Sequence, residues 1–216
     1  MLIKIIELKQ RFNINVKGIL HIGAHECEEF NDYLNLGIPY DKIYWIEALQ
    51  HKVDEKLKKY KVIKIYQAVI SDKDNEEINF NITNCDGDTN NLQSSSILEF
   101  GSHKTSHPQV KVVDTKKLKT SRMDTVIERN NIDMNNVNFV NLDIQGVELR
   151  ALKSMGKYLH NIDYIYTEVN TEEVYINCDK MDDITKYLSQ HGFILADARI
   201  YKQFGWGDAF YIKENL

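Results

Sequence analysis

Apolar residues along this chain follow two periods: short runs typical of buried strands, and i, i+3, i+4 spacing typical of helices. In the first third, the short runs predict strands over residues 18–22, 42–46 and 62–66. Helices are predicted between them. The first begins with acids at Glu26 and Glu28 and continues through Phe30, and the second carries Val53 and Leu57 on its buried face. This order indicates parallel strands joined by right-handed crossovers.

Residues 76–116 interrupt that alternation. Strand-like segments at 78–82 and 110–113 enclose a polar loop at 84–91 and a run of three serines, 94–96. We interpret this part as a β-rich insertion that crosses the mouth of a crevice in the sheet.

The alternation then resumes towards the C-terminus. A helix is predicted at 123–129, a strand at 137–142, a helix with Leu149 and Leu152 buried, a strand at 162–166 and a helix at 181–188. Closing strands follow at 193–195 and 209–212, joined by a loop at 204–208. Residues 1–15 predict a short amphipathic helix that packs on the domain through Ile3, Ile6 and Leu8. We expect residues 1–216 to form a single α/β domain.

Composition narrows the class of protein. Hydrophobic residues make up 43% and charged residues 27%, as in globular proteins. A net charge of −5 argues against a nucleic-acid surface, because such surfaces carry clustered Lys and Arg. Three cysteines without a C-x-x-C pair predict reduced thiols and a cytoplasmic location. Charges within the first twelve residues exclude a signal peptide or membrane span there.

A candidate ligand-binding loop follows the first strand. Gly23 and Ala24 remove side-chain bulk where the chain leaves that strand, a geometry that lets the backbone approach a nucleotide-like ligand. Only the first glycine of G-x-G-x-x-G is present, because His25 and Glu28 occupy the other two positions. A nicotinamide-dependent oxidoreductase is therefore the weaker alternative.

Acidic residues follow three of the predicted parallel strands. Glu47, Asp143 and Glu168 each come at a strand's carboxyl end, and those ends share one edge of the sheet. Glu47 could accept both hydrogen bonds of a ribose diol, and residues 67–72 could border an adenine. Close buried carboxylates repel one another, which indicates a ligand, a cation or a catalytic use.

At this point the sequence resembles the FkbM-type family of S-adenosylmethionine-dependent O-methyltransferases, over residues 16–211. The resemblance rests on the order and spacing of six blocks: L-H-I-G-A-H-E-C-E-E, Y-W-I-E-A, Q-A-V-I-S-D, Q-S-S-S-I-L-E-F, N-F-V-N-L-D-I-Q-G-V-E-L-R-A-L-K and I-Y-T-E-V-N. It implies a class I methyltransferase sheet, Rossmann-like and mostly parallel, with an antiparallel closing strand and helices on both faces. It also implies S-adenosylmethionine as cofactor and a small molecule or saccharide as acceptor.

The resemblance also implies roles for individual residues. The expected cofactor contacts are His21, Gly23, Ala24, His25, Glu47, Ala48, Ala68, Val69 and Asp143. The candidate general bases are Asp143 and Glu168, with His25, His103 or His107 as substitutes. The expected acceptor side comprises Ser95, Ser96, His103, Gln145, Asn170, Tyr175 and Trp206, since polar groups beside aromatic faces suit a polyol.

Several alternatives stay open from the sequence. Asp143, Glu168 and Asn170 could together hold a magnesium ion, because all three supply hard oxygen ligands. The family commonly has an acid at the position of His21 and a glycine at that of Cys27, so a catalytically silent small-molecule or protein-binding module is conceivable. An RNA methyltransferase is least favoured, because the chain is not basic and shows no lysine-containing catalytic tetrad.

Overall fold

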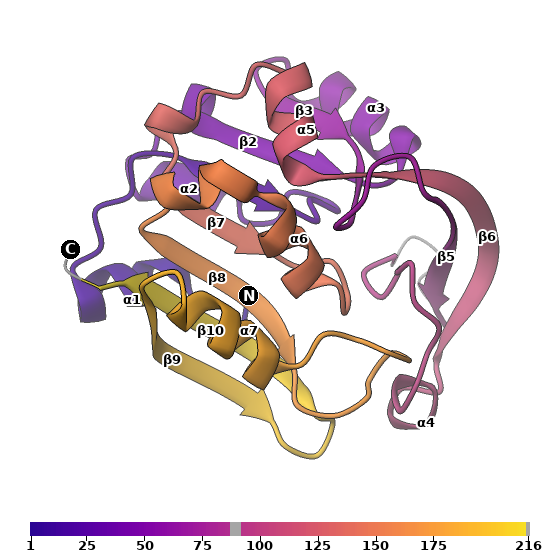
Figure 1. Cartoon of the computed structure of the whole chain (residues 1–216). Helices are drawn as coiled ribbons and strands as arrows, with labels where there is room; N and C mark the ends of the chain where they lie inside the picture. Colours follow the sequence, from indigo (N-terminus) through magenta and orange to yellow (C-terminus); the bar gives the residue numbers. More distant parts are fainter. Residues whose placement is uncertain (87–91, 215–216) are drawn as a thin grey trace.

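A seven-stranded sheet forms the centre of the protein (Figure 1), and the computed structural model describes residues 1–86 and 92–214. The strand order is β3-β2-β1-β7-β8-β10-β9. The strands are β1 (Ile19–Ile22), β2 (Ile43–Glu47), β3 (Lys64–Gln67), β7 (Phe139–Leu142), β8 (Tyr164–Asn170), β9 (Phe193–Tyr201) and β10 (Trp206–Lys213). Strands β3, β2, β1, β7 and β8 run parallel to one another, whereas β10 is antiparallel to both β8 and β9. This is the class I methyltransferase sheet expected from the sequence.

Helices cover both faces of this sheet. They are α1 (Ile5–Phe12), α2 (Phe30–Asn35), α3 (Gln50–Lys59), α5 (Met123–Arg129), α6 (Glu148–Ser154) and α7 (Met181–Ser189). A further helix, α4 (His103–Ser106), lies to one side of this sheet (Figure 1). Short 3₁₀ turns occupy Tyr40–Lys42, Met134–Asn136 and Gly156–Asn161. None of the helices in the described part of the chain combines the length and apolar character that a membrane crossing requires.

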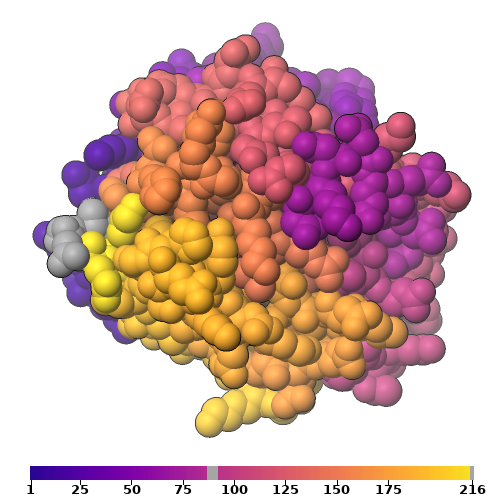
Figure 2. All heavy atoms as spheres, in the orientation of Figure 1, coloured from indigo at the N-terminus to yellow at the C-terminus, as the bar shows by residue number. Residues whose placement is uncertain are grey.

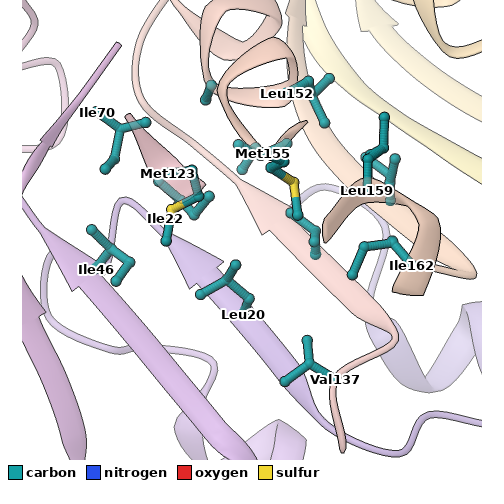
Figure 3. Close-up of a cluster of buried hydrophobic side chains, with 14 of the residues drawn as sticks. Leu20, Ile22, Ile46, Ile70, Met123, Val137, Leu152, Met155, Leu159 and Ile162 are labelled. Carbon is teal, nitrogen blue, oxygen red and sulfur yellow. The ribbon is translucent and has the colours of Figure 1, made fainter. Parts of the chain in front are cut away.

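Two hydrophobic cores sandwich the sheet because successive strand residues point to opposite faces. Leu20 and Ile22 of β1 pack with α5, α6 and α7 on one face (Figure 3). Ile19, the preceding residue, packs with α1 and α2 on the other face. The near-continuous apolar character of β1 and β7 follows from burial on both sides.

A second, three-stranded sheet contains most of the predicted insertion. It consists of β4 (Val69–Ile70), β6 (Val110–Ser121) and β5 (Glu77–Cys85), in that order. β5 and β6 form a long antiparallel ribbon beside the main sheet (Figure 1), and β6 ends parallel to β4. Part of the predicted 84–91 loop lies outside the described residues, and Asn84 and Cys85 belong to β5.

The insertion also contacts the C-terminal half of the chain. The backbone N–H of Gly101 donates to Val174 at 2.9 Å, and Phe100 forms an antiparallel bridge with Tyr175. In the space-filling view the magenta insertion lies directly against the orange segment (Figure 2). These contacts bring residues 92–103 to the edge of the main sheet.

Several sequence-based boundaries were wrong. The first helix after β1 begins at Phe30 and not at Glu26, because His25 and Cys27 adopt left-handed conformations, with φ of 40° and 55°. Ile3 and Leu8 are buried as predicted, but Ile6 of α1 is 47% exposed and Ile5 is buried in its place. Leu57 of α3 is 48% exposed, and the buried face of that helix contains two lysines.

The C-terminal strands are also longer than predicted. β8 continues to Asn170, three residues beyond the partner of the last β7 residue, so Glu168 and Asn170 lie within the strand. β10 begins at Trp206, which places Trp206 and Asp208 in a strand and not in the predicted loop. Backbone pairing between β8 and β10, which no local pattern reveals, extends both strands.

An ion cluster holds the turn between β1 and α2 against α3. Glu26 binds the ammonium groups of Lys52 and Lys56, whose side chains are 7% and 4% exposed. Burial disfavours the charged carboxylate, but the hydrogen bonds and charges of the two lysines outweigh it and lower the pKa of Glu26 to about 2. Glu26 thus bridges two buried cations, and Glu55 lies 3.8 Å from the ammonium of Lys52.

Truncation of Leu152, which is fully buried, should lower the free energy of unfolding by about 2–5 kcal/mol in Leu152→Ala. The matched control Leu57→Ala removes the same atoms from an exposed helix position and should stay within about 0.5 kcal/mol of wild type. Urea denaturation of both variants tests this contrast. Equal losses would contradict the assignment of the two helix faces.

The Glu26 cluster predicts a pH-dependent stability. The pKa of Glu26 is lowered on folding, so its contribution is fully present above its ordinary pKa of 4.5 and is lost as pH falls towards 2. Glu26→Gln should therefore lower the free energy of unfolding at pH 6, and the difference from wild type should shrink steadily below pH 4.5. A difference that stays constant from pH 6 to pH 3 would contradict the ion cluster.

Candidate active site

The loops that follow β1, β2 and β7 meet at one edge of the sheet. Gly23 has a φ of 96°, and a Cβ there would lie 1.8 Å from the carbonyl oxygen of Asp143. The backbone N–H groups of Gly23 and Ala24 donate to Ile46 at 2.9 and 3.0 Å. Only glycine permits this approach, so the sequence at this position determines how closely the loops pack.

Glu47 lies at the end of β2 and binds the neighbouring loops. One carboxylate oxygen accepts the backbone N–H of His25 at 2.8 Å, and the other accepts that of Leu49 at 2.9 Å. Burial raises the pKa of Glu47, although these hydrogen bonds act in the opposite direction. Each oxygen keeps a second lone pair, so the carboxylate can still accept hydrogen bonds from a ligand diol.

A crevice opens between these loops and the insertion, with about 650 Å³ of space that includes its solvent-open part. Its polar side includes Gly23, His25, Glu47 and Asp143. Its apolar side includes Ile46, Ala68, Val69, Phe80, Ile97 and Val147. A mostly apolar cleft with a few directed polar groups is typical of a small-ligand site.

A second cavity adjoins the first, and the two share Gly23, His25, Gln93, Asp143 and Gln145. The second cavity is more polar. Its carboxylates are Glu28, Glu29, Asp143, Glu168 and Asp208, and its rings are His21, His25, His103, His107, Tyr175 and Trp206. Because Asp143 lines both cavities, it stands where two ligands could meet.

Gln145 connects the residues around this junction. Its backbone is left-handed, with φ of 58°, and its side-chain N–H₂ donates to Asp143 and Glu168. Its side-chain oxygen accepts the hydroxyl of Tyr175, and its backbone oxygen accepts that of Ser96 at 2.7 Å. One amide therefore fixes the positions of both candidate bases.

Glu148 stabilises the loop that follows β7, which contains Gln145. Its carboxylate accepts the backbone N–H groups of Ile144 and Gly146 at 3.1 Å, while the side chain is fully buried. Burial raises the pKa of Glu148 to about 8. Sequence alone does not indicate this role, because an acid at a helix start normally indicates only a cap.

The surroundings of Glu168 disfavour its charged form. Burial, followed by the charge of Asp143, raises the pKa of Glu168 well above its ordinary value. Its direct partner across the β8–β10 pair is Asp208, a further acid whose pKa is raised by burial. These surroundings favour the protonated form of Glu168, in which the carboxyl group cannot accept a further proton.

His21 belongs to a buried network on the sheet. Its Nδ1 lies 3.0 Å from the hydroxyl of Tyr33, which also accepts from Asn141 at 2.8 Å, and its ring stacks on Trp45 at 4.5 Å. Burial lowers the pKa of His21 to about 4, so the ring is neutral. It lines the second cavity and does not line the first.

The structure brings most of the sequence-selected residues to the two cavities. The first is lined by Gly23, His25, Glu47, Ala48, Ala68, Val69, Ser95, Asp143 and Gln145. The second adds His21, His103, Glu168, Tyr175 and Trp206. Ala24, Ser96 and Asn170 are buried and line neither cavity, although Ala24 and Ser96 hold the loops that do.

Other lining residues were not selected from the sequence. Lys52, Leu49 and Phe80 face the first cavity, and Glu29 and Asp208 face the second. Asp208 was assigned to a loop, and only its pairing with Glu168 in the antiparallel register brings it to the site. An acid two residues after Trp206 in the sequence was the available signal.

The candidate magnesium ligands do not fit an ion. Among residues 1–86 and 92–214, no group of three or more His, Cys, Asp or Glu side chains is arranged to hold a metal. The amide of Gln145 lies between Asp143 and Glu168, and Asn170 contributes to neither cavity. We therefore derive no step through a metal.

Comparison with known proteins also indicates a methyltransferase. A family model described as the methyltransferase FkbM domain matches residues 21–195. No curated protein matches the chain. Among solved structures, methyltransferase FkbM from Methylobacillus flagellatus KT is 12% identical with a TM-score of 0.55, over 90% of this chain and 43% of that chain. The present chain thus spans less than half the length of that relative.

Two further structures are similar at a lower TM-score. The magnesium protoporphyrin IX methyltransferase from Synechocystis PCC 6803, with bound SAM, is 10% identical (TM-score 0.46) over 91% of this chain and 69% of that one. TrmK from M. capricolum, in complex with S-adenosyl-homocysteine, is 10% identical (TM-score 0.45), over 92% and 62% respectively.

The FkbM match covers most of the strands and loops that build both cavities, from β1 through the start of β9. The resemblance seen in the six sequence blocks is therefore confirmed. The chain belongs to the FkbM methyltransferase family.

Proposed function

We propose that this protein transfers the methyl group of S-adenosylmethionine to a hydroxyl of a small molecule or saccharide. The observation that carries the proposal is the junction of two cavities at Gly23, His25, Asp143 and Gln145. A two-substrate transfer needs adjoining sites with a proton acceptor between them, and this edge of the sheet provides that arrangement.

The residues of the first cavity fit S-adenosylmethionine. Glu47 has free lone pairs for a ribose diol, Ala68, Val69 and Phe80 offer an apolar surface for an adenine, and the bare backbone at Gly23 admits the methionine part. When bound, this cofactor supplies an electrophilic methyl group that needs no further activation. The protein must then position the acceptor oxygen and receive its proton.

Positioning contributes more than proton transfer in such a reaction. A well-oriented pair of reactants can supply about 7–11 kcal/mol of the barrier, whereas a general base adds about 10²–10⁴-fold in rate. Tyr175, Gln145 and Ser96 form a connected set of hydrogen bonds that fixes the wall between the cavities. We assign the base to Asp143, because burial and the charge of Asp143 raise the pKa of Glu168 and favour its protonated form.

A catalytically silent binding module is the alternative that the same cavities allow. Cofactor binding without methyl transfer to any acceptor would favour it. The nicotinamide-dependent oxidoreductase is not proposed further, since the chain belongs to a methyltransferase family.

Removal of the Glu47 carboxylate should weaken cofactor binding. Glu47→Ala loses two hydrogen bonds to the ribose, about 1–3 kcal/mol, which raises the Kd for S-adenosylhomocysteine by roughly 5- to 150-fold. Calorimetric titration measures this change, and Asp54→Ala on the exposed side of α3 serves as the control. An unchanged Kd in Glu47→Ala would remove Glu47 from the cofactor site.

Neutralisation of Asp143 should separate chemistry from cofactor affinity. Asp143→Asn should lower kcat by about 10²–10⁴-fold and change the Kd for S-adenosylhomocysteine by much less. S-adenosylhomocysteine release with the best acceptor from a panel of hexoses and hexosamines measures kcat. Glu168→Gln, which mimics a protonated carboxyl, should lose less than about tenfold. The opposite order of losses would assign the base to Glu168.

A further inference from the structure

Strand β9 is the last strand of the main sheet and has an open edge (Figure 1). One edge of β9 pairs with β10, and no strand in the described part of the chain pairs with the other. Ile194, Leu195 and Tyr201 on this strand are 49%, 41% and 41% exposed. An edge strand with exposed apolar side chains and unpaired backbone groups is a template for a further strand.

Two other edge strands are protected against such pairing. β6 pairs with β4 only through its last two residues, and its open stretch carries Lys111, Lys116, Lys117 and Lys119. β3, at the other end of the main sheet, has only four residues. β9 has nine residues and contains neither Lys nor Pro, two residue types that block the pairing of edge strands.

Helix α1 neutralises the two charged residues of β9. Asp197 binds Arg11 at 2.5 Å, and Arg199 binds Glu7. The two charges of β9 are also opposite to each other and lie two positions apart in the strand. The charge of β9 therefore does not repel a second β-strand.

The hydrogen bonds between β9 and β10 show which backbone groups face the open edge. Glu214 donates its backbone N–H to Gly192 beside the start of β9. Because successive residues of a strand point their backbone groups to opposite sides, every second residue of β10 bonds to β9. The β9 residues whose backbone groups then face the open edge are Leu195, Ala198 and Ile200.

A second copy of the chain fits this edge in the antiparallel direction, about a twofold axis at Ala198. Asp197 then lies opposite Arg199 of the second copy, a cross-strand pair of opposite charges. Ala198 exchanges both backbone hydrogen bonds with Ala198 of the second copy. In the single chain the N–H of Ala198 donates to the carboxylate of Asp197 at 2.9 Å, a bond that this pairing replaces.

The match continues beyond a β-bulge in the strand. Ala196 is left without a partner in β10, because the register shifts at this point. The same offset places Leu195 opposite Ile200 of the second copy, and Ile194 opposite Tyr201. All of these apolar side chains except Ile200 are exposed in the single chain. Pairing would therefore remove exposed apolar surface from water.

We propose that β9 is the interface of a symmetric homodimer, in which the β9 strands of two copies pair antiparallel about Ala198 and join the two main sheets. Opposite charges, apolar side chains and backbone directions all match in this register. Tyr201 packs on Trp206 with ring centroids 5.2 Å apart, so the interface extends to a residue that lines the second cavity.

The protein concentration at which the chain associates tests this proposal. Fluorescence-detected sedimentation velocity from about 10 nM to 100 µM measures the dimer Kd, because dimerisation depends on concentration. The wild-type protein should reach twice the mass of one chain within this range. Amide hydrogen exchange at Leu195, Ala198 and Ile200 should be slower in the dimer than in a monomeric variant.

Variants assign the association to β9. Leu195→Lys brings a charge into an apolar contact twice in a symmetric dimer, so the Kd should rise by at least about tenfold. Ala198→Pro removes the N–H at the twofold axis and should have a similar effect, and an edge strand tolerates proline where the N–H faces solvent. The control Val112→Lys introduces the same charge on the open stretch of β6 and should leave the Kd unchanged. Circular dichroism verifies that each variant is folded.

Several outcomes would overturn the proposal. One is a wild-type protein that stays monomeric over the whole concentration range. Another is a dimer whose Kd is unchanged in either of the folded β9 variants, or is raised equally by Val112→Lys. Equal exchange rates at Leu195, Ala198 and Ile200 in the wild-type dimer and in monomeric Leu195→Lys would also exclude β9 as the interface.

Discussion

The close contact between the backbone of Gly23 and that of Asp143 is the constraint on which both cavities depend. A side chain at position 23 would occupy the space of the Asp143 carbonyl. The loops after β1 and β7 would then move apart, and Asp143 would no longer stand between the two cavities. A single residue without a side chain therefore sets the spacing of residues that are distant in sequence.

Most of the strands and helices could be predicted from the local pattern of apolar residues. The run of apolar residues in β1 and the helix with Leu149 and Leu152 buried were predicted because burial on the sheet requires them. The errors arose where long-range contacts overrode local preference. Leu57 is exposed because Lys52 and Lys56 occupy the buried face of α3, where they bind Glu26, a residue far from them in sequence.

The candidate site was predictable only where residues follow parallel strands. Glu47 and Asp143 could be selected because the carboxyl ends of such strands meet at one edge. Asp208 could not, because its position depends on the register of an antiparallel pair. Likewise, the role of Gln145 depends on a left-handed backbone that residue type alone does not indicate.

The central place of β1 in the sheet has a consequence for synthesis of the chain. One edge of β1 pairs with β2, some two dozen residues later, but the other pairs with β7, in which Ile22 meets Leu142. While the chain emerges from the ribosome, that second edge has no partner until residue 142 is made. An apolar strand with an open edge is prone to pair with other chains. The chain is therefore most prone to aggregate during synthesis, before β7 has been made and has paired with β1.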